Sequence, residues 1–297
     1  MKTYVVLGAT GHTGKPIALG LLEQGHTVRI IARNTAKTRE LTDKGALLFQ
    51  GDGRDVEFLK KVFAGADALY ALVPMDTQAT DFYQTQVSHV SAVAAALKSS
   101  TITYVVALSS LGAHLSSGAG VVQGLQKMEE LFNELPGVHV LYLRAGYFLE
   151  NGLGMAPMVK MMNILGTPVK ADLKIPMVAT KDIAAVGLKH LLALDFTGKS
   201  IVYVLGARDY TYEEITSIYG AAIGNPSLRY IQFPYDDAKR AMTMLGMGLS
   251  ASERMVEFSK AMNEGLVFTE HQRTAENTTA TTAEEFALVF RDVYENS

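Results

Sequence analysis

The chain has 297 residues, of which 48% are hydrophobic and 19% carry a charge, and its formal net charge is −3. This balance excludes the basic surface that is typical of nucleic-acid binding, and we expect neither a nucleic-acid nor a membrane partner. The absence of cysteine excludes disulfides, thiolate catalysis and cysteine-ligated metal sites. No apolar run reaches the ~20 residues that a membrane helix needs, and no signal-like segment precedes the first strand, so we expect a cytoplasmic protein.

Strand-like and helix-like patterns alternate through the first half of the chain. Apolar runs bounded by turn residues predict strands at 3–7, 27–32, 46–50, 67–73, 103–108 and 138–143. The segments between them predict helices at about 14–24, 35–43, 55–63, 81–98 and 122–134. Such alternation is typical of βαβ units and a parallel sheet. We therefore expect an α/β fold in which residues 1–150 form a Rossmann-type, doubly wound, dinucleotide-binding domain.

The alternation ends after residue 145. We expect residues 151–297 to form mostly a smaller, discontinuous C-terminal α/β lobe that binds substrate, with a part at about 175–205 returning to the Rossmann sheet. Four methionines within this region follow a short helical pattern, and they either fill a core or line an adaptable apolar substrate pocket. These methionines are Met155, Met158, Met161 and Met162.

A glycine-rich turn joins the first predicted strand to the first predicted helix. Glycine leaves room where the backbone meets a pyrophosphate, and the free N–H groups at a helix start favour an anion. Two threonines in the turn can add hydroxyl donors. This strand-turn-helix context predicts a dinucleotide site whose contacts come from Gly8, Thr10, Gly11, His12, Thr13 and Gly14.

The end of the second strand indicates which dinucleotide is bound. NAD-binding proteins usually carry an Asp or Glu here for the ribose 2′-hydroxyl, but the strand ends in Ile30-Ile31-Ala32-Arg33-Asn34. The planar guanidinium of Arg33 suits a 2′-phosphate instead, and Lys37 can assist it. We therefore expect NADP(H) as the preferred cofactor, with NAD(H) as the alternative.

Later strand ends supply further candidate cofactor contacts. Asp52 follows the third strand, where its carboxylate can accept from the adenine amino group, and Leu72 and Pro74 close the fourth strand beside the expected adenine ribose. Tyr147 and Asn151 follow the sixth strand and can border the nicotinamide or the substrate. The seven histidines show no short metal-ligand spacing, so we predict no metal.

Several of these segments together resemble the NmrA-like branch of the atypical short-chain dehydrogenases/reductases. The resemblance is carried by GATGxTG, Arg33, the Gly51-Asp52 step and the runs 144–151 (RAGYFLEN) and 175–184 (IPMVATKDIA). It extends over most of the chain, to about residue 286, and is strongest to quinone reductase-like members. It implies a Rossmann-type domain, a small C-terminal substrate lobe and a cleft between them, in a family that contains both enzymes and redox sensors.

The resemblance also directs attention to the Tyr-x-x-x-Lys pair of short-chain dehydrogenases, in which the Tyr is the acid/base. The matching positions here are Gln123 and Lys127, and glutamine cannot exchange a proton at neutral pH. Lys127 is the remaining candidate for cofactor binding and for the acid/base role, as in isoflavone-reductase-like relatives. Ser109 is the second catalytic candidate, because the family often has a serine facing the nicotinamide or substrate at that strand edge.

An intact cofactor site without the usual tyrosine leads to two functional hypotheses. The first is an NADPH-dependent oxidoreductase that reduces a small electrophile such as a quinone, because hydride transfer to such an acceptor depends mainly on positioning. The alternative is a non-catalytic NAD(P)(H)-binding redox sensor that acts through a protein partner. A sugar-nucleotide epimerase or dehydratase is a third hypothesis, against which the missing tyrosine argues.

Overall fold

The computed structural model describes all 297 residues and contains a seven-stranded sheet in which every pair of strands is parallel. The strand order is β3-β2-β1-β4-β5-β6-β10, which is that of a doubly wound Rossmann-type fold and confirms the predicted fold class. The strands are β1 (Thr3–Val6), β2 (Thr27–Ala32), β3 (Leu47–Gln50), β4 (Ala68–Ala71), β5 (Tyr104–Ser110), β6 (His139–Ala145) and β10 (Lys199–Val204).

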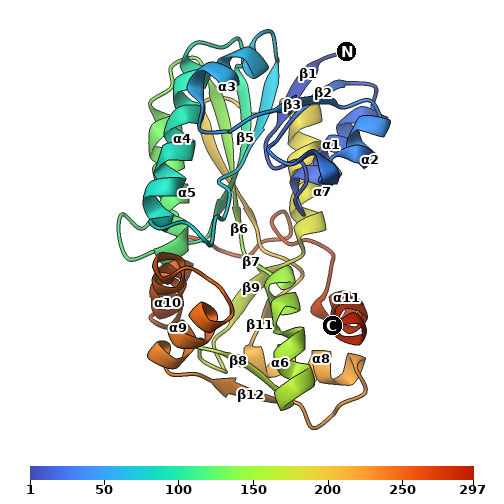
Figure 1. Cartoon of the computed structure of the whole chain (residues 1–297), viewed down its shortest axis with the longest axis vertical. Coiled ribbons are helices and arrows are strands. Elements are labelled where there is room, and N and C mark those ends of the chain that lie inside the picture. Colours follow the sequence, from blue (N-terminus) through green and yellow to red (C-terminus); the bar gives the residue numbers. More distant parts are fainter.

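Helices cover both faces of this sheet (Figure 1). Alternate residues along β1 point to opposite faces, so Val5 and the following Leu7 join the core on one face while Tyr4 and Val6 join the core on the other. The first face is covered by α3 (Val56–Phe63), α4 (Phe82–Lys98) and α5 (Gln123–Asn133), and the second by α1 (Gly14–Glu23) and α7 (Thr180–Ala193). The helix expected at 35–43 is instead a 3₁₀ turn, η1 (Thr35–Lys37), followed by the short α2 (Arg39–Asp43).

The remaining elements form a separate lobe with its own hydrophobic core, below the sheet in Figure 1. It contains a three-stranded sheet in the order β11-β9-β7 and a parallel pair, β12-β8. Its elements are β7 (Tyr147–Phe148), η3 (Leu149–Met155), α6 (Ala156–Met162), β8 (Ile164–Thr167), β9 (Ile175–Val178), β11 (Asp209–Tyr210), α8 (Tyr212–Ala222), β12 (Arg229–Gln232), α9 (Tyr235–Met244), α10 (Leu249–Asn263), η4 (Leu266–Phe268) and α11 (Ala283–Asn296).

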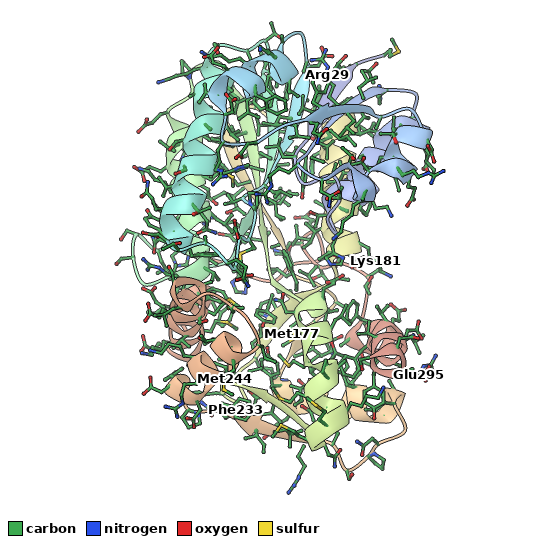
Figure 2. The ribbon with its side chains drawn as sticks, in the orientation of Figure 1. Arg29, Met177, Lys181, Phe233, Met244 and Glu295 are labelled. Atoms are coloured by element: carbon green, nitrogen blue, oxygen red, sulfur yellow. The ribbon has the colours of Figure 1, made fainter.

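The lobe is discontinuous in sequence. Within the segment expected to return to the main sheet, α7 and β10 do so, but β9 does not: it pairs with β7 and β11 inside the lobe. Figure 2 shows the consequence, with Met177 of β9 in the lobe and Arg29 of β2 near the other end of the molecule. A fully apolar strand is compatible with either sheet, so its hydrophobicity alone did not distinguish them.

The strand order reverses between β1 and β4, which are neighbours in the sheet although β2 follows β1 in the chain. In open α/β sheets the ligand crevice lies beyond the carboxyl ends of the strands at this reversal. The glycine turn after β1 and the segment after β4 therefore meet at the expected binding position. None of the helices combines the length and the hydropathy that crossing a bilayer would require.

Candidate functional site

The glycine turn after β1 is closed tightly on itself. Gly8 has a φ of +61°, and its carbonyl accepts a hydrogen bond from the Gly11 amide at 2.9 Å. A Cβ at Gly14 would lie 2.3 Å from the Gly8 oxygen, so no larger residue fits there without moving the backbone. The α1 N-terminus carries no acidic residue in its first turn and no side-chain cap. The amides of His12, Thr13 and Gly14 donate to no protein group and are free to bind an anion.

The two threonines of this turn have different surroundings. The Thr13 side chain is buried, and its hydroxyl accepts a hydrogen bond of 3.0 Å from Tyr70 in the core. Thr10 is exposed and lines the adjoining pocket, as do Gly8 and Leu7. Of the two predicted hydroxyl donors, only that of Thr10 therefore faces the pocket.

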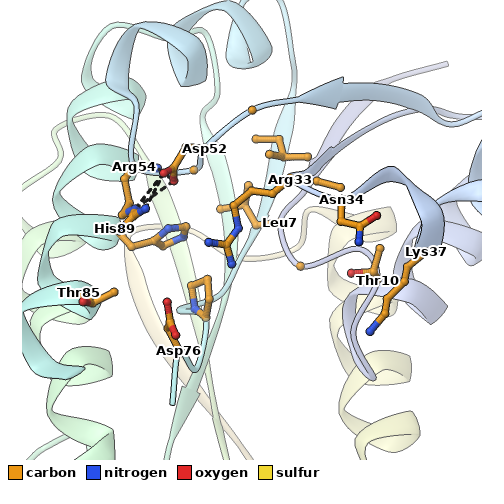
Figure 3. A pocket seen from close by; sticks show the side chains of 16 residues that line it. Leu7, Thr10, Arg33, Asn34, Lys37, Asp52, Arg54, Asp76, Thr85 and His89 are labelled. Atoms are coloured by element: carbon orange, nitrogen blue, oxygen red, sulfur yellow. Dashed lines mark hydrogen bonds and ion pairs between the residues drawn. The ribbon is translucent and has the colours of Figure 1, made fainter. Parts of the chain in front are cut away.

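A polar pocket of about 380 Å³ opens beside this turn, beyond the ends of β1, β2 and β3. Figure 3 shows the Arg33 side chain reaching into it from the end of β2. We call this cavity the polar pocket. It is lined by Leu7, Gly8, Thr10, Ile31, Ala32, Arg33, Asn34, Lys37, Gly51, Asp52, Gly53, Arg54, Pro74, Asp76, Thr85 and His89.

Arg33 and Lys37 are the cationic groups of the polar pocket that form no ion pair. The Asn34 side chain accepts from the Ala36 amide at 2.9 Å and so orders the turn that carries Lys37. Two cationic side chains outside any ion pair, in a pocket that is also lined by Gly8 and Thr10 of the glycine turn, are suitable groups for binding a phosphate. The structure places both side chains on the wall of the polar pocket, and their role in binding a phosphate stays a prediction.

Asp52 also lines the polar pocket, but its carboxylate is engaged by Arg54. The Arg54 Nη2 atom lies 2.7 Å from Asp52 Oδ2, and Arg54 Nε lies 3.1 Å from both carboxylate oxygens. Hydrogen bonding to Arg54 lowers the pKa of Asp52 below its usual value. An adenine amino group would therefore share the Asp52 carboxylate with Arg54. The sequence analysis missed the contact between Asp52 and Arg54, although the Asp-x-Arg spacing indicates it.

His89 on α4 is a further pocket residue that the sequence analysis did not identify. Its ring packs against Gly53, where a Cβ would lie 2.8 Å from His89 Cε1. Burial lowers the pKa of His89 from its usual 6.5 to about 4, and its Nε2 atom is buried without a hydrogen-bond partner. The polar pocket is therefore walled on this side by a neutral imidazole.

A second cavity, the apolar pocket, has a volume of about 240 Å³ and lies between the main sheet and the lobe. None of its twenty lining residues carries a formal charge at neutral pH, and fifteen are hydrophobic. They are Leu72, Val73, Met75, Gln86, Leu108, Ser109, Ser110, Leu111, Val121, Val122, Leu125, Gly146, Tyr147, Phe148, Asn151, Met255, Phe258, Met262, Val267 and Phe268. The predicted cleft between domain and lobe is therefore apolar.

The two pockets share a wall, the segment Leu72–Asp76 after β4. Pro74 and Asp76 line the polar pocket, whereas Leu72, Val73 and Met75 line the apolar pocket. Leu72 was expected beside an adenine ribose, but the structure places it on the apolar side. A ligand that extends along the carboxyl edge of the sheet would reach both cavities from this segment.

Ser109, at the end of β5, lies on the wall of the apolar pocket with its hydroxyl already engaged. The hydroxyl donates to Glu129 Oε1 at 2.5 Å. Glu129 is held in turn by Arg144, which also reaches Glu270 after η4. The Ser109 hydroxyl hydrogen is therefore directed away from the pocket, and the Ser109 oxygen can only accept a hydrogen bond from a group in the pocket.

Lys127 lines neither pocket. Its ammonium group forms an ion pair of 2.9 Å with Glu130 on the surface of α5, and that partner raises its pKa. The α5 residue that does line the apolar pocket is Leu125. Gln123 is buried and donates to the carbonyls of Leu115 and Ser116, which fixes the preceding loop. The structure thus does not bring Lys127 together with the other candidates.

The predicted methionine pattern does not form the substrate pocket. Met161 and Met162 are 77% and 61% exposed, and none of the four methionines lines either cavity. The apolar pocket takes its methionines from elsewhere, namely Met75, Met255 and Met262. Met255 and Met262 lie on α10, more than a hundred residues after the strands that they face, so no local pattern revealed them.

A doubly wound sheet with a glycine turn after β1 and a free arginine after β2 defines the class of NAD(P)-binding Rossmann-type proteins. Within that class, the family model described as "NmrA-like family" matches residues 1–287, and the chain belongs to this family. The resemblance stated from the sequence motifs is thereby confirmed.

Three individual relatives are similar to the chain at identities of 17–26%. The chain is 26% identical over 253 residues to an NAD(P)H azoreductase from Xenophilus azovorans, with 85% of each chain covered. Its fold is similar to that of an NADPH-dependent quinone oxidoreductase from Escherichia coli complexed with NADPH, at a TM-score of 0.78, 19% identity and coverage of 96% and 98%. It is also similar to NmrA, a negative transcriptional regulator, in complex with NADP, at a TM-score of 0.71, 17% identity and coverage of 99% and 93%.

Proposed function

We propose that this protein is an NADPH-dependent reductase that delivers a hydride to a small, uncharged electrophile such as a quinone. The observation that carries the proposal is the pairing of two unlike pockets across the segment Leu72–Asp76. One contains free cationic side chains beside a glycine turn, and the other contains no charged side chain at all. This division suits an anionic cofactor on one side and an apolar acceptor on the other.

The residues of the polar pocket fit a phosphorylated dinucleotide. The free amides of His12, Thr13 and Gly14 would hold the pyrophosphate, while Arg33 and Lys37 would hold a 2′-phosphate. When bound, the nicotinamide of such a cofactor supplies the hydride. The names of the azoreductase and quinone oxidoreductase relatives support both the cofactor and the reaction type.

The lining of the apolar pocket supports the proposal of an uncharged aromatic acceptor. Aromatic and methionine side chains such as Phe258, Phe268 and Met262 favour a planar aromatic molecule, and the lack of charge disfavours an ionised one. An apolar lining also disfavours water around the reacting atoms. Hydride transfer to a quinone yields a stabilised anion, so this chemistry does not depend on the tyrosine that Gln123 replaces.

The test is NADPH oxidation, followed by absorbance, with a panel of uncharged quinones, azo compounds and carbonyl compounds. We expect steady turnover with NADPH, weaker turnover with NADH, and little with sulfonated analogues of the same acceptors. Tight NADPH binding without turnover on any quinone, azo compound or carbonyl would contradict the proposal. That outcome would favour a redox sensor, whose partner binding or assembly state should then differ between oxidised and reduced cofactor.

A further inference from the structure

Two tyrosines meet at the boundary between the apolar pocket and the lobe core. Tyr147, on β7, lines the pocket, and Tyr212, the first residue of α8, lies behind it. Their ring centroids are 6.4 Å apart with an interplanar angle of 74°, an edge-to-face arrangement. Tyr212 is only 3% exposed, so its environment is that of the protein interior.

The Tyr212 hydroxyl is buried and has no hydrogen-bond partner. A desolvated donor without an acceptor is costly and rare in folded proteins, so its presence calls for an explanation. The ring of Tyr230 stacks on that of Tyr212, with the ring centroids 5.1 Å apart. Tyr230 is not the hydrogen-bond partner of Tyr212, because its own hydroxyl donates to the carbonyls of Val169 and Thr167. The other aromatic ring that packs against Tyr212 is that of Tyr147.

The electrostatic surroundings of Tyr147 support a role for this neighbour. Burial raises the pKa of Tyr147, while the neighbouring polar groups of Tyr212 and Asn151 act in the opposite direction. Donors directed at a phenol oxygen stabilise the phenolate more than the phenol. The Tyr212 hydroxyl, which has no partner, therefore stabilises this site most once Tyr147 has lost its proton and its oxygen can accept a strong hydrogen bond.

Tyr147 is the strongest acid among the side chains that line the apolar pocket, because the hydroxyls of Ser109 and Ser110 and the amides of Gln86 and Asn151 are far weaker acids. Tyr147 is the one titratable residue among the twenty that line it. Ser109 donates to Glu129, and the Gln86 amide donates to the carbonyl of Val121. Lys127 lies outside the pocket in its ion pair with Glu130.

We propose that Tyr147 is a catalytic residue that donates a proton to the reduced acceptor, and that Tyr212 is a positioning residue that stabilises the resulting phenolate. The inference rests on the proposed function, because the acceptor must first gain a hydride from the reduced nicotinamide. As that hydride bonds to one atom of the acceptor double bond, the π electron pair moves to the other atom, a heteroatom. The heteroatom then takes the proton of Tyr147, so that the Tyr147 O–H bond breaks and a new O–H or N–H bond forms. The Tyr147 phenolate regains a proton from solvent when the product leaves the pocket.

Turnover of two acceptor types separates this role from a structural one. An azo nitrogen needs a proton as it is reduced, whereas a quinone can leave as a stabilised anion. Tyr147→Phe should lower kcat for an uncharged azo compound by roughly 100-fold or more, and for a quinone by less than about tenfold. Tyr294→Phe on α11, which removes a hydroxyl that bonds to no protein group and lines neither pocket, is the matched control and should change neither rate.

Ligand binding provides a readout that needs no turnover. The 4-nitrophenolate anion presents an oxyanion on an aromatic ring, and its absorbance reports binding to the protein. Both Tyr147→Phe and Tyr212→Phe should weaken its binding by about tenfold, the usual effect of losing a hydrogen bond to a charged group. Binding of the neutral nitrobenzene should stay unchanged in both variants and in Tyr294→Phe.

The two assays distinguish failure of this inference from failure of the proposed function. If wild-type protein turns over acceptors and Tyr147→Phe lowers the azo and quinone rates equally, or binds nitrophenolate as wild type does, Tyr147 is not the proton donor. If wild-type protein turns over no acceptor but nitrophenolate binding still depends on Tyr147 and Tyr212, the proposed reduction is wrong while the donor pair remains. Unchanged nitrophenolate binding in both variants overturns the inference in either case.

Discussion

Arg144 on β6 and Glu129 on α5 form a buried two-point ion pair, with Nη2 to Oε2 at 2.6 Å and Nε to Oε1 at 3.1 Å. Both side chains are only 8% exposed. Arg144 also donates to Glu270 at 2.7 Å, while Glu129 accepts from Ser109. This network joins the main sheet, α5 and the segment after η4, and it holds the Ser109 wall of the apolar pocket in place.

Loss of one partner of this pair should destabilise the protein strongly. Glu129→Ala leaves the Arg144 guanidinium buried without its main counterion, and we expect a loss of about 3–5 kcal/mol in the free energy of unfolding. Urea denaturation followed by circular dichroism measures it. Lys127→Ala on the same helix removes only a surface pair and should cost about 0.5 kcal/mol or less. Equal losses in the two variants would show that the buried pair is not a major contributor.

Arg33 should determine the preference for NADPH over NADH. Under the proposed role of Arg33, Arg33→Ala would remove a charge-assisted contact to the 2′-phosphate, so NADPH affinity should fall roughly 10- to 100-fold while NADH affinity stays nearly unchanged. Fluorescence titration of both cofactors measures the two affinities. Arg39→Ala, which removes a nearby exposed arginine outside the pocket, is the control. An equal loss for both cofactors would rule out Arg33 as the 2′-phosphate contact.

Gly14 should tolerate no side chain. In Gly14→Ala the new Cβ meets the Gly8 carbonyl oxygen at 2.3 Å, and the backbone must move to relieve the contact. We expect a loss of about 1–3 kcal/mol in stability and at least roughly tenfold weaker NADPH binding. Gly154→Ala, whose Cβ would have no atom within 4 Å, should change neither. Thermal unfolding and cofactor titration of the two variants provide the comparison. If Gly14→Ala binds NADPH as tightly as wild type does, the glycine turn is not the pyrophosphate-binding site.

His89 should make stability depend on pH in mildly acidic solution. Burial lowers its pKa from 6.5 to about 4, so between these values the unfolded chain binds a proton that the folded protein does not. The free energy of unfolding should therefore fall as the pH drops from about 6.5 towards 4, by up to roughly 3 kcal/mol, with no contribution from His89 at higher pH.

The measurement is urea denaturation of wild type and His89→Asn across this pH range. The variant cannot titrate at this position, so its stability should fall less steeply than that of wild type. Other groups that titrate in the same range affect both proteins and cancel in the difference. Parallel curves for the two proteins would show that His89 is not the group responsible.

Local patterns predicted the first half of the fold well because their causes are local. The strand β1, the glycine turn and α1 follow from an apolar run, a φ that favours glycine and an apolar face at helical spacing, all within about twenty residues. Arg33 could likewise be placed at a strand end without tertiary information. In contrast, β9 was assigned to the wrong sheet, because an apolar four-residue strand carries no signal of its pairing partner.

The sequence by itself determined a Rossmann-type domain with a glycine turn after its first strand, since each element there is specified by neighbouring residues. Only the tertiary structure decided which side chains meet in the apolar pocket, because Tyr147 and Met262 come from segments more than a hundred residues apart. The fold also turned Lys127 outward to Glu130 and brought Tyr212 behind Tyr147. Helical spacing alone could not exclude Lys127 from the site, since the packing of α5 against α4 and the main sheet decides which face of α5 meets the pocket.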